Sequence, residues 1–142
     1  MHSIRDILRD KGTTIRYIDP DATVFEALRQ MAEHGIGALL VLEGGKPIGL
    51  FSERDYARKL ALHGLRSRET AVRTIMSHPV LTISPDASVQ QGLSIMTEKY
   101  IRHLPVVERS GVIGMVSIGD LVKAVIEDQQ SLIEQLESYL VR

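Results

Sequence analysis

Two short segments of the chain pair a hydroxyl with a carboxylate three residues later: Ser52 with Asp55, and Ser117 with Asp120. Each pair follows an apolar run and precedes a helical pattern, so it lies where a strand ends and a helix begins. Free backbone N–H groups and the helix dipole favour an anion such as phosphate at a helix start. A carboxylate can also accept hydrogen bonds from the two hydroxyls of a ribose. Both pairs are therefore candidates for nucleotide binding.

The same spacing has a purely structural interpretation. Ser-x-x-Asp is an N-capping arrangement, in which the two side chains satisfy backbone N–H groups that would otherwise lack a partner. From the residues of these two segments alone, the binding role and the capping role both remain open.

The other polar residues do not form a pattern typical of an enzyme. The five histidines are scattered without metal-ligand spacing, and the absence of cysteine excludes a thiolate nucleophile. No Gly-x-Ser-x-Gly elbow occurs. The segment 44–46, Gly-Gly-Lys, lacks the full spacing of a phosphate loop and indicates a hairpin turn instead. We therefore expect no catalytic residues and no metal site.

Composition narrows the class of protein further. The chain has 142 residues, of which 44% are hydrophobic and 25% charged, as in ordinary globular proteins. A net charge of -1 gives no electrostatic reason to expect a nucleic acid or an anionic membrane as partner. No apolar run reaches the length of a membrane span, and residues 1–11 lack a signal-peptide core. We expect a cytoplasmic location.

The elements that position the two Ser-x-x-Asp pairs occur twice. Residues 15–60 align without a gap on residues 80–125, with identities along the whole window, including both Ser-x-x-Asp pairs. A shorter resemblance precedes each copy, between residues 4–8 and 72–76. The chain is therefore a tandem repeat, and each repeat opens with a short amphipathic segment.

Local signals predict the same elements in each repeat. Thr23-x-x-Glu26 and Ser88-x-x-Gln91 have the spacing of capping boxes, and each is followed by apolar residues at helical intervals. Gly35 is suited to end the first of these helices. Apolar runs at 38–42 and 103–107, each followed by a turn and a second run, predict hairpins. Each repeat is thus expected to read β-α-β-β-α.

These elements predict an α+β fold, in which two motifs with pseudo-two-fold symmetry form one integrated domain. The expected segments are motif 1 at 1–62, a solvated connector at 63–71, motif 2 at 72–127 and a helix extension at 128–142. The terminal helix carries apolar residues beyond the repeat and must cover something. Packing on its own domain and packing on a second subunit both remain open.

The duplicated pattern resembles a pair of CBS (cystathionine β-synthase) domains, an arrangement called a Bateman module. In similar proteins the residue matching Asp55 or Asp120 holds the ribose, and the one matching Ser52 or Ser117 lies near ribose or phosphate. Adenine lies between the first strand and the start of the hairpin. The ligand-binding residues that the resemblance implies are Ile18, Gly37, Ala38, Leu39, Ser52, Arg54, Asp55 and Lys59 in the first site, and Thr82, Ile83, Ile101, Arg102, His103, Pro105, Ser117 and Asp120 in the second.

The two repeats differ where a phosphate would bind. The second has Arg102 and His103, which can bind phosphate through charge-assisted hydrogen bonds. The first has the small residues Gly37 and Ala38 at these positions, and its cations lie on the helix after Ser52. We therefore expect two unequal sites, the second suited to AMP and the first to a longer ligand such as NAD(H) or ATP.

The resemblance implies a non-enzymatic, adenine-nucleotide-sensing module. It would act as a homodimer on an effector protein in trans, with no catalytic cofactor. Two alternatives remain: a structural dimerisation module that binds no ligand, and a small enzyme acting on nucleotides.

Overall fold

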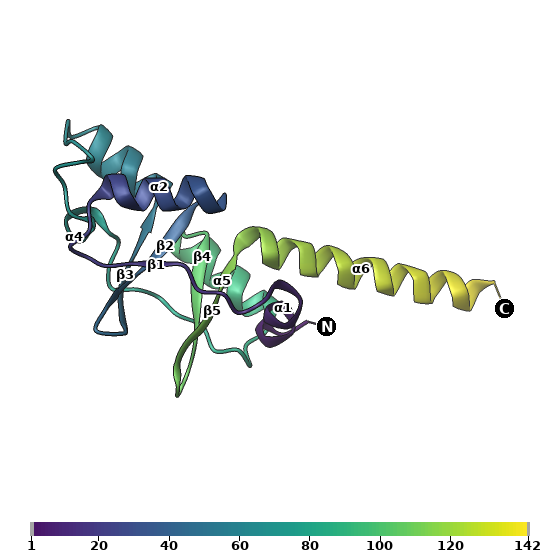
Figure 1. Cartoon of the computed structure of the whole chain (residues 1–142). Helices are drawn as coiled ribbons and strands as arrows, with labels where there is room; N and C mark the ends of the chain where they lie inside the picture. Colours follow the sequence, from purple (N-terminus) through teal and green to yellow (C-terminus); the bar gives the residue numbers. More distant parts are fainter. Residues whose placement is uncertain (1, 142) are drawn as a thin grey trace. The chain divides into compact units, whose positions relative to one another are not determined.

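The computed structural model describes residues 2–141, and the chain divides into two compact units. The first-repeat unit consists of residues 15–81, and the second-repeat unit consists of residues 1–14 together with 82–142. Figure 1 shows the helices and strands of both units. Within the described residues, no helix is long and apolar enough to cross a membrane.

The first-repeat unit contains a three-stranded sheet in which β1 pairs in parallel with β2, and β2 pairs antiparallel with β3. The helix α2 connects β1 to β2, and the β2–β3 hairpin leads into the helical turns after Ser52. In chain order the elements are β1 (Tyr17–Ile18), α2 (Val24–His34), β2 (Ala38–Glu43), β3 (Lys46–Ser52), α3 (Glu53–Asp55), the π-helix η1 (Tyr56–Ala61) and α4 (Val72–Ile75).

The second-repeat unit has its elements in the same order as the first, but its first strand is shortened to a single residue. Its hairpin is antiparallel, but in place of a first strand there is a single parallel bridge between Ile83 and Val106. The Ile83 backbone still makes both hydrogen bonds of that bridge, to Pro105 O and from Val107 N, each 3.0 Å long. The predicted α+β class and repeated motif are confirmed. The elements are α1 (Ile4–Lys11), α5 (Val89–Lys99), β4 (His103–Glu108), β5 (Gly111–Ser117) and α6 (Ile118–Leu140).

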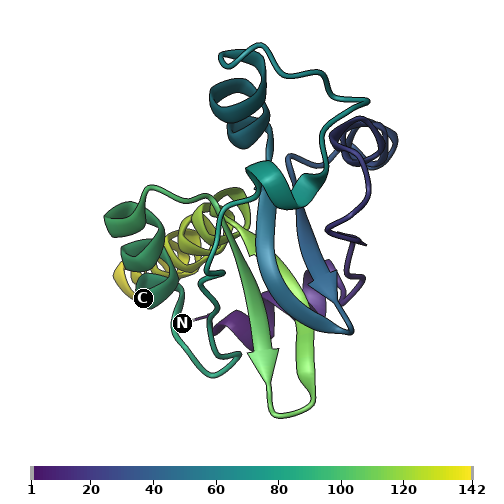
Figure 2. The same cartoon turned by 90° about the vertical axis from the view of Figure 1, so that its left-hand side faces the viewer.

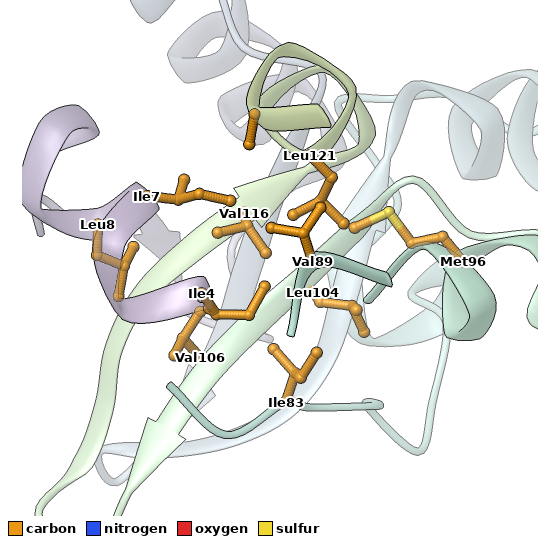
Figure 3. Packing of buried hydrophobic residues seen from close by; sticks show 11 residues of the cluster. Ile4, Ile7, Leu8, Ile83, Val89, Met96, Leu104, Val106, Val116 and Leu121 are labelled. Carbon is orange, nitrogen blue, oxygen red and sulfur yellow. The ribbon is translucent and has the colours of Figure 1, made fainter. Parts of the chain in front are cut away.

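The opening helices of the two repeats are exchanged between the compact units. The buried face of α1 packs in the core of the second-repeat unit (Figure 3), and Figure 2 shows this purple helix beside the green hairpin. The buried face of α4, which opens the second repeat, packs in the core of the first-repeat unit. The segments 1–62 and 72–127 thus describe the repeats along the chain, whereas each compact unit contains the opening helix of the other repeat.

Equivalent backbone hydrogen bonds hold the two exchanged helices. Ile4 N donates to Ala87 O over 3.0 Å, and Val72 N donates to Ala22 O over 2.9 Å. Ala22 and Ala87 occupy the same position of the repeat. The resemblance between residues 4–8 and 72–76 therefore reflects two helices that bind to the same place on each other's repeat.

Two glycines at equivalent positions of the hairpins make room for these helices. A Cβ atom on Gly114 would lie 2.6 Å from Leu8 Cδ2, and one on Gly49 would lie 2.5 Å from Met76 Sδ. Such distances are far shorter than van der Waals contact, so the absence of a side chain lets the helix approach the strand. The glycine shared by both repeats is required by packing at this point.

The predicted helix ends are mostly confirmed. Ser88 and Gln91 form a complete capping box. In the first repeat only half of the box exists: Glu26 N donates to Thr23 Oγ1 over 3.1 Å, while the Glu26 carboxylate pairs with Arg29 instead. The expectation of a full box there was wrong because the Arg29 guanidinium competes for the carboxylate. Gly35 ends α2 in the left-handed conformation, as expected.

We predict that Gly114→Ala lowers the free energy of unfolding by about 1–3 kcal/mol, because the new methyl group would overlap Leu8. Urea denaturation measures the change, and the further substitution Leu8→Ala should make Gly114→Ala nearly neutral. Gly119→Ala is the matched control, since its Cβ would meet nothing closer than Ser117 Oγ at 3.6 Å. An equal loss of stability in both single variants would contradict the packing role of Gly114.

Candidate functional site

Both Ser-x-x-Asp pairs form reciprocal capping boxes at the starts of α3 and α6. Ser52 N donates to Asp55 Oδ2 over 3.0 Å and Asp55 N donates to Ser52 Oγ over 3.2 Å. Ser117 N donates to Asp120 Oδ2 over 2.8 Å and Asp120 N donates to Ser117 Oγ over 3.2 Å. The capping interpretation is therefore confirmed. The ribose-binding role of the same carboxylates remains a prediction.

The starts of these helices offer fewer free donors than the sequence suggested. Besides the capped N–H of each aspartate, Glu53 N donates to Gly37 O over 3.1 Å and Ile118 N donates to Arg102 O over 2.9 Å. These N–H groups are not available to an anion. A phosphate at either site would depend chiefly on charged side chains.

The predicted site residues of each repeat lie within one compact unit. The hairpin register places Ala38 opposite Ser52 and His103 opposite Ser117, so the start of each hairpin is beside its Ser-x-x-Asp pair. Leu39, however, is fully buried in the core of the first-repeat unit and presents no surface to a ligand.

Three of the predicted residues of the second site line pockets, and these lie in two separate pockets. Thr82 and Ile83 line one pocket at the start of α5, together with Gln91 and Ser94. Asp120 lines another pocket of about 210 Å³, formed between α1 and α6. That volume is smaller than the roughly 300–1,000 Å³ typical of ligand sites.

In the first-repeat unit the Asp55 carboxylate is buried and already has several donors. Its side chain is only 5% exposed. Besides the capping bonds to Oδ2, its Oδ1 accepts a 2.8 Å hydrogen bond from Ser77 Oγ and lies 3.0 Å from Lys59 Nζ. Lys59 Nζ also donates to Ser77 Oγ over 3.2 Å. A ribose would have to displace one of these groups.

The Asp120 carboxylate is more accessible, with 25% of its side chain exposed. Lys11, at the end of α1, donates to Asp120 Oδ2 over 2.6 Å and to the carbonyl oxygen of Met115 over 2.9 Å. Within residues 2–141 the hydrogen bonds to this carboxylate all end on Oδ2. Asp120 therefore keeps one oxygen for a further donor, whereas both oxygens of Asp55 are in use.

The electrostatics around Asp120 suit a ligand with both hydroxyl and phosphate groups. Burial by itself would raise the pKa of Asp120, but hydrogen bonds from Lys11 and from Ser117 N outweigh it and lower that pKa. Burial lowers the pKa of His103, and the positive charge of Lys11 lowers it further. At neutral pH the site therefore holds a carboxylate, a neutral imidazole and the cations Lys11 and Arg102 nearby.

Two residues of these sites, Lys11 and Ser77, are absent from the sequence prediction. Lys11 is the last residue of α1 and Ser77 lies just after α4. Each reaches the aspartate of the other repeat because these opening helices are exchanged. The resemblance between residues 4–8 and 72–76 indicates that each repeat has an opening helix. It does not indicate that each helix packs on the other repeat. Among the described residues, no cluster of three His, Cys, Asp or Glu side chains could hold a metal ion.

The repeat and the fold of this chain are similar to those of known proteins. The CBS domain family model matches twice, over residues 4–62 and 72–127. The mitochondrial CBS domain-containing protein CBSX3 of Arabidopsis thaliana is 35% identical, over 97% of this chain and 71% of its own length. The CBS domain-containing protein YhcV of Bacillus subtilis is 31% identical, over 85% of this chain and 84% of its own.

A solved structure from Burkholderia ambifaria, described as a signal-transduction protein with CBS domains, has the same fold. It superimposes with a TM-score of 0.86 at 44% identity, and the match covers 90% of this chain and 96% of that one.

We predict that Asp55→Ala destabilises the protein more than Asp120→Ala does. Removing Asp55 costs a helix cap and also takes an acceptor from the exposed residue Ser77 and from Lys59, whose side chain is 44% exposed, so we expect a loss of about 2 kcal/mol. Removing Asp120 costs chiefly a helix cap, about 1 kcal/mol. Urea denaturation of the two variants measures the difference. Equal losses of unfolding free energy in the two variants would contradict this prediction, because they would show that both carboxylates contribute equally to stability.

Proposed function

Because this chain belongs to the CBS domain family and carries a tandem pair of these domains, we propose that it is a regulatory module that binds an adenine nucleotide beside Asp120. CBS domain pairs are commonly regulatory or ligand-sensing modules, and stand-alone CBS domain proteins are regulatory and non-catalytic.

The difference between the two duplicated aspartates carries the proposal. Asp120 is partly exposed, keeps one carboxylate oxygen without a donor from residues 2–141, and lies near Lys11, Arg102 and His103. A carboxylate next to cations matches a ribose with a phosphate attached. Asp55 is buried and its donors are already in place. We therefore assign the principal site to the second-repeat unit.

AMP is the ligand that this site favours, because one phosphate is enough to pair with the few cations around Asp120. ATP and NAD(H) are the alternatives of the same class. The first site, with Gly37 and Ala38 in place of Arg102 and His103, has room for a longer ligand but would have to displace Ser77 or Lys59 from Asp55.

We infer that Lys11 transmits the binding event. Ribose hydroxyls on Asp120 would compete with the Lys11 ammonium group, which would turn toward the phosphate and loosen the end of α1. The response can be no larger than the difference in ligand affinity between the two states. In this proposal the altered packing is read by a second subunit of a homodimer and by an effector protein in trans.

A structural dimerisation module without ligand is the second candidate. The complete capping boxes of Ser52 and Ser117 favour it, since they give both aspartates a role in the absence of any nucleotide. The experiment below separates the two candidates.

We predict that titration calorimetry detects one AMP site per chain and that Asp120→Ala weakens AMP binding at least tenfold without unfolding the protein. Lys11→Met should weaken the binding of AMP but not of adenosine, because adenosine has no phosphate for the ammonium group to reach. Full AMP affinity in Asp120→Ala would refute the ribose role. Absence of binding by AMP, ATP and NAD(H) to the native chain would favour the structural module.

We predict that AMP binding takes up protons near pH 7. The lowered pKa keeps His103 neutral in the free protein, and a bound phosphate stabilises the imidazolium, so AMP affinity should rise as the pH falls from 8 to 6.5. Calorimetry in buffers of different ionisation enthalpy measures the uptake. It should be absent for adenosine and in His103→Gln, and an unchanged uptake in that variant would exclude His103 as the group that is protonated.

A further inference from the structure

The second half of α6 is an isolated helix with an exposed apolar face. Past Asp128, every described residue of the chain is exposed, including Ile133 at 47% and Leu136 at 57% (the yellow end of the helix in Figure 1). Nothing among residues 2–141 covers this face. Of the two alternatives that the sequence left open, packing on its own unit holds only for the first turns of α6, which bury Leu121 and Ala124.

The exposed face has the spacing of a coiled coil. Its central residues alternate at intervals of four and three, and a repeat of this kind keeps one face of a helix against a partner helix over several turns. Leu132 and Tyr139, one position away from this line, widen the apolar face. The residues of the line are Val122, Ile126, Gln129, Ile133, Leu136 and Leu140.

The charges beside the apolar line indicate what covers it. The acidic residues Glu127, Asp128, Glu134 and Glu137 lie along the helix, so an anionic membrane surface would be repelled. Lys123 and Glu137 occupy the same edge of the line, near its two ends. Two copies in antiparallel orientation bring Lys123 of each beside Glu137 of the other, whereas in parallel copies this edge faces the opposite edge of the partner, where Val125, Leu132 and Tyr139 offer no opposite charge.

We propose that α6 pairs with α6 of a second copy of this chain as an antiparallel helical seam. In the register set by the charges, Ile126 packs on the partner's Leu136, and Leu140 packs on the partner's Val122. The two Leu132 side chains meet near the two-fold axis. The seam deepens the proposed function in one respect: it names the contact that would hold the proposed homodimer together. It does not require a bound nucleotide.

Single cysteines test the orientation in the full-length protein, because the chain has none of its own. Leu132→Cys should form a disulfide-linked dimer under mild oxidation. Leu136→Cys should not, because antiparallel pairing separates the two copies of that residue by about 15 Å along the helix. Cross-linking by Leu136→Cys alone would overturn the antiparallel arrangement, and cross-linking by neither variant would overturn the seam.

Charge and core variants test the same contact in solution by sedimentation. Ile133→Asp should halve the mass of the assembly, while Ser131→Asp on the opposite face of α6 should leave it unchanged. Lys123→Glu and Glu137→Lys should each weaken association at least threefold, and the double variant should restore it. Equal masses for Ile133→Asp and Ser131→Asp would refute the seam. AMP titration of Ile133→Asp keeps the two proposals apart, because nucleotide binding should persist when the seam is lost.

Discussion

The contact between an opening helix and a side-chain-free position on a strand is the constraint on which the rest of this structure depends. Leu8 of α1 rests on Gly114, and Met76 rests on Gly49, the equivalent glycine of the other repeat. Each contact brings a helix from one repeat into the core of the unit that contains the other. The exchange contributes to both hydrophobic cores: α1 buries Ile4, Ile7 and Leu8 in one, and α4 buries Val72 and Ile75 in the other.

The same exchange makes the two sites unequal. It delivers Ser77 to Asp55 and Lys11 to Asp120, and these donors differ in consequence. The Ser77 hydroxyl and the Lys59 ammonium group both contact the buried Asp55 carboxylate, whereas a single long lysine side chain at the end of a helix contacts Asp120 and can leave it. A duplicated motif thus has one aspartate with a structural role and one that is accessible to a ligand.

The helix α6 connects the proposed ligand site with the proposed seam. It begins at the capping box of Ser117 and Asp120 and continues for 23 residues as one element. The part near Asp120 is held by α1 and α5, while the residues beyond Asp128 are exposed throughout the described chain. If release of Lys11 shifts α1, the shift would therefore be passed to α6, whose far end we propose to contact the partner subunit.

Much of this protein followed from the sequence. The repeat predicted two α+β motifs, the turn residues predicted the hairpins, and the Ser-x-x-Asp spacing marked the helix starts, because all of these are local properties. Where two local interactions competed, the prediction was incomplete: Arg29, three residues later on the same helix, takes the Glu26 carboxylate from the expected capping box. Leu39, expected to line a ligand site, is buried in the core of the first-repeat unit, and its burial could not be read from the local pattern.

The choice between the two copies was decided by tertiary structure. Ser52 and Asp55 are identical in type and spacing to Ser117 and Asp120, so no pattern in the sequence can say which carboxylate is buried or saturated. That difference comes from Ser77 and Lys11, residues that are distant in sequence and reach the sites only through exchanged helices. The sequence by itself determined which groups are duplicated, and the packing of α1 and α4 decided which of them is left accessible.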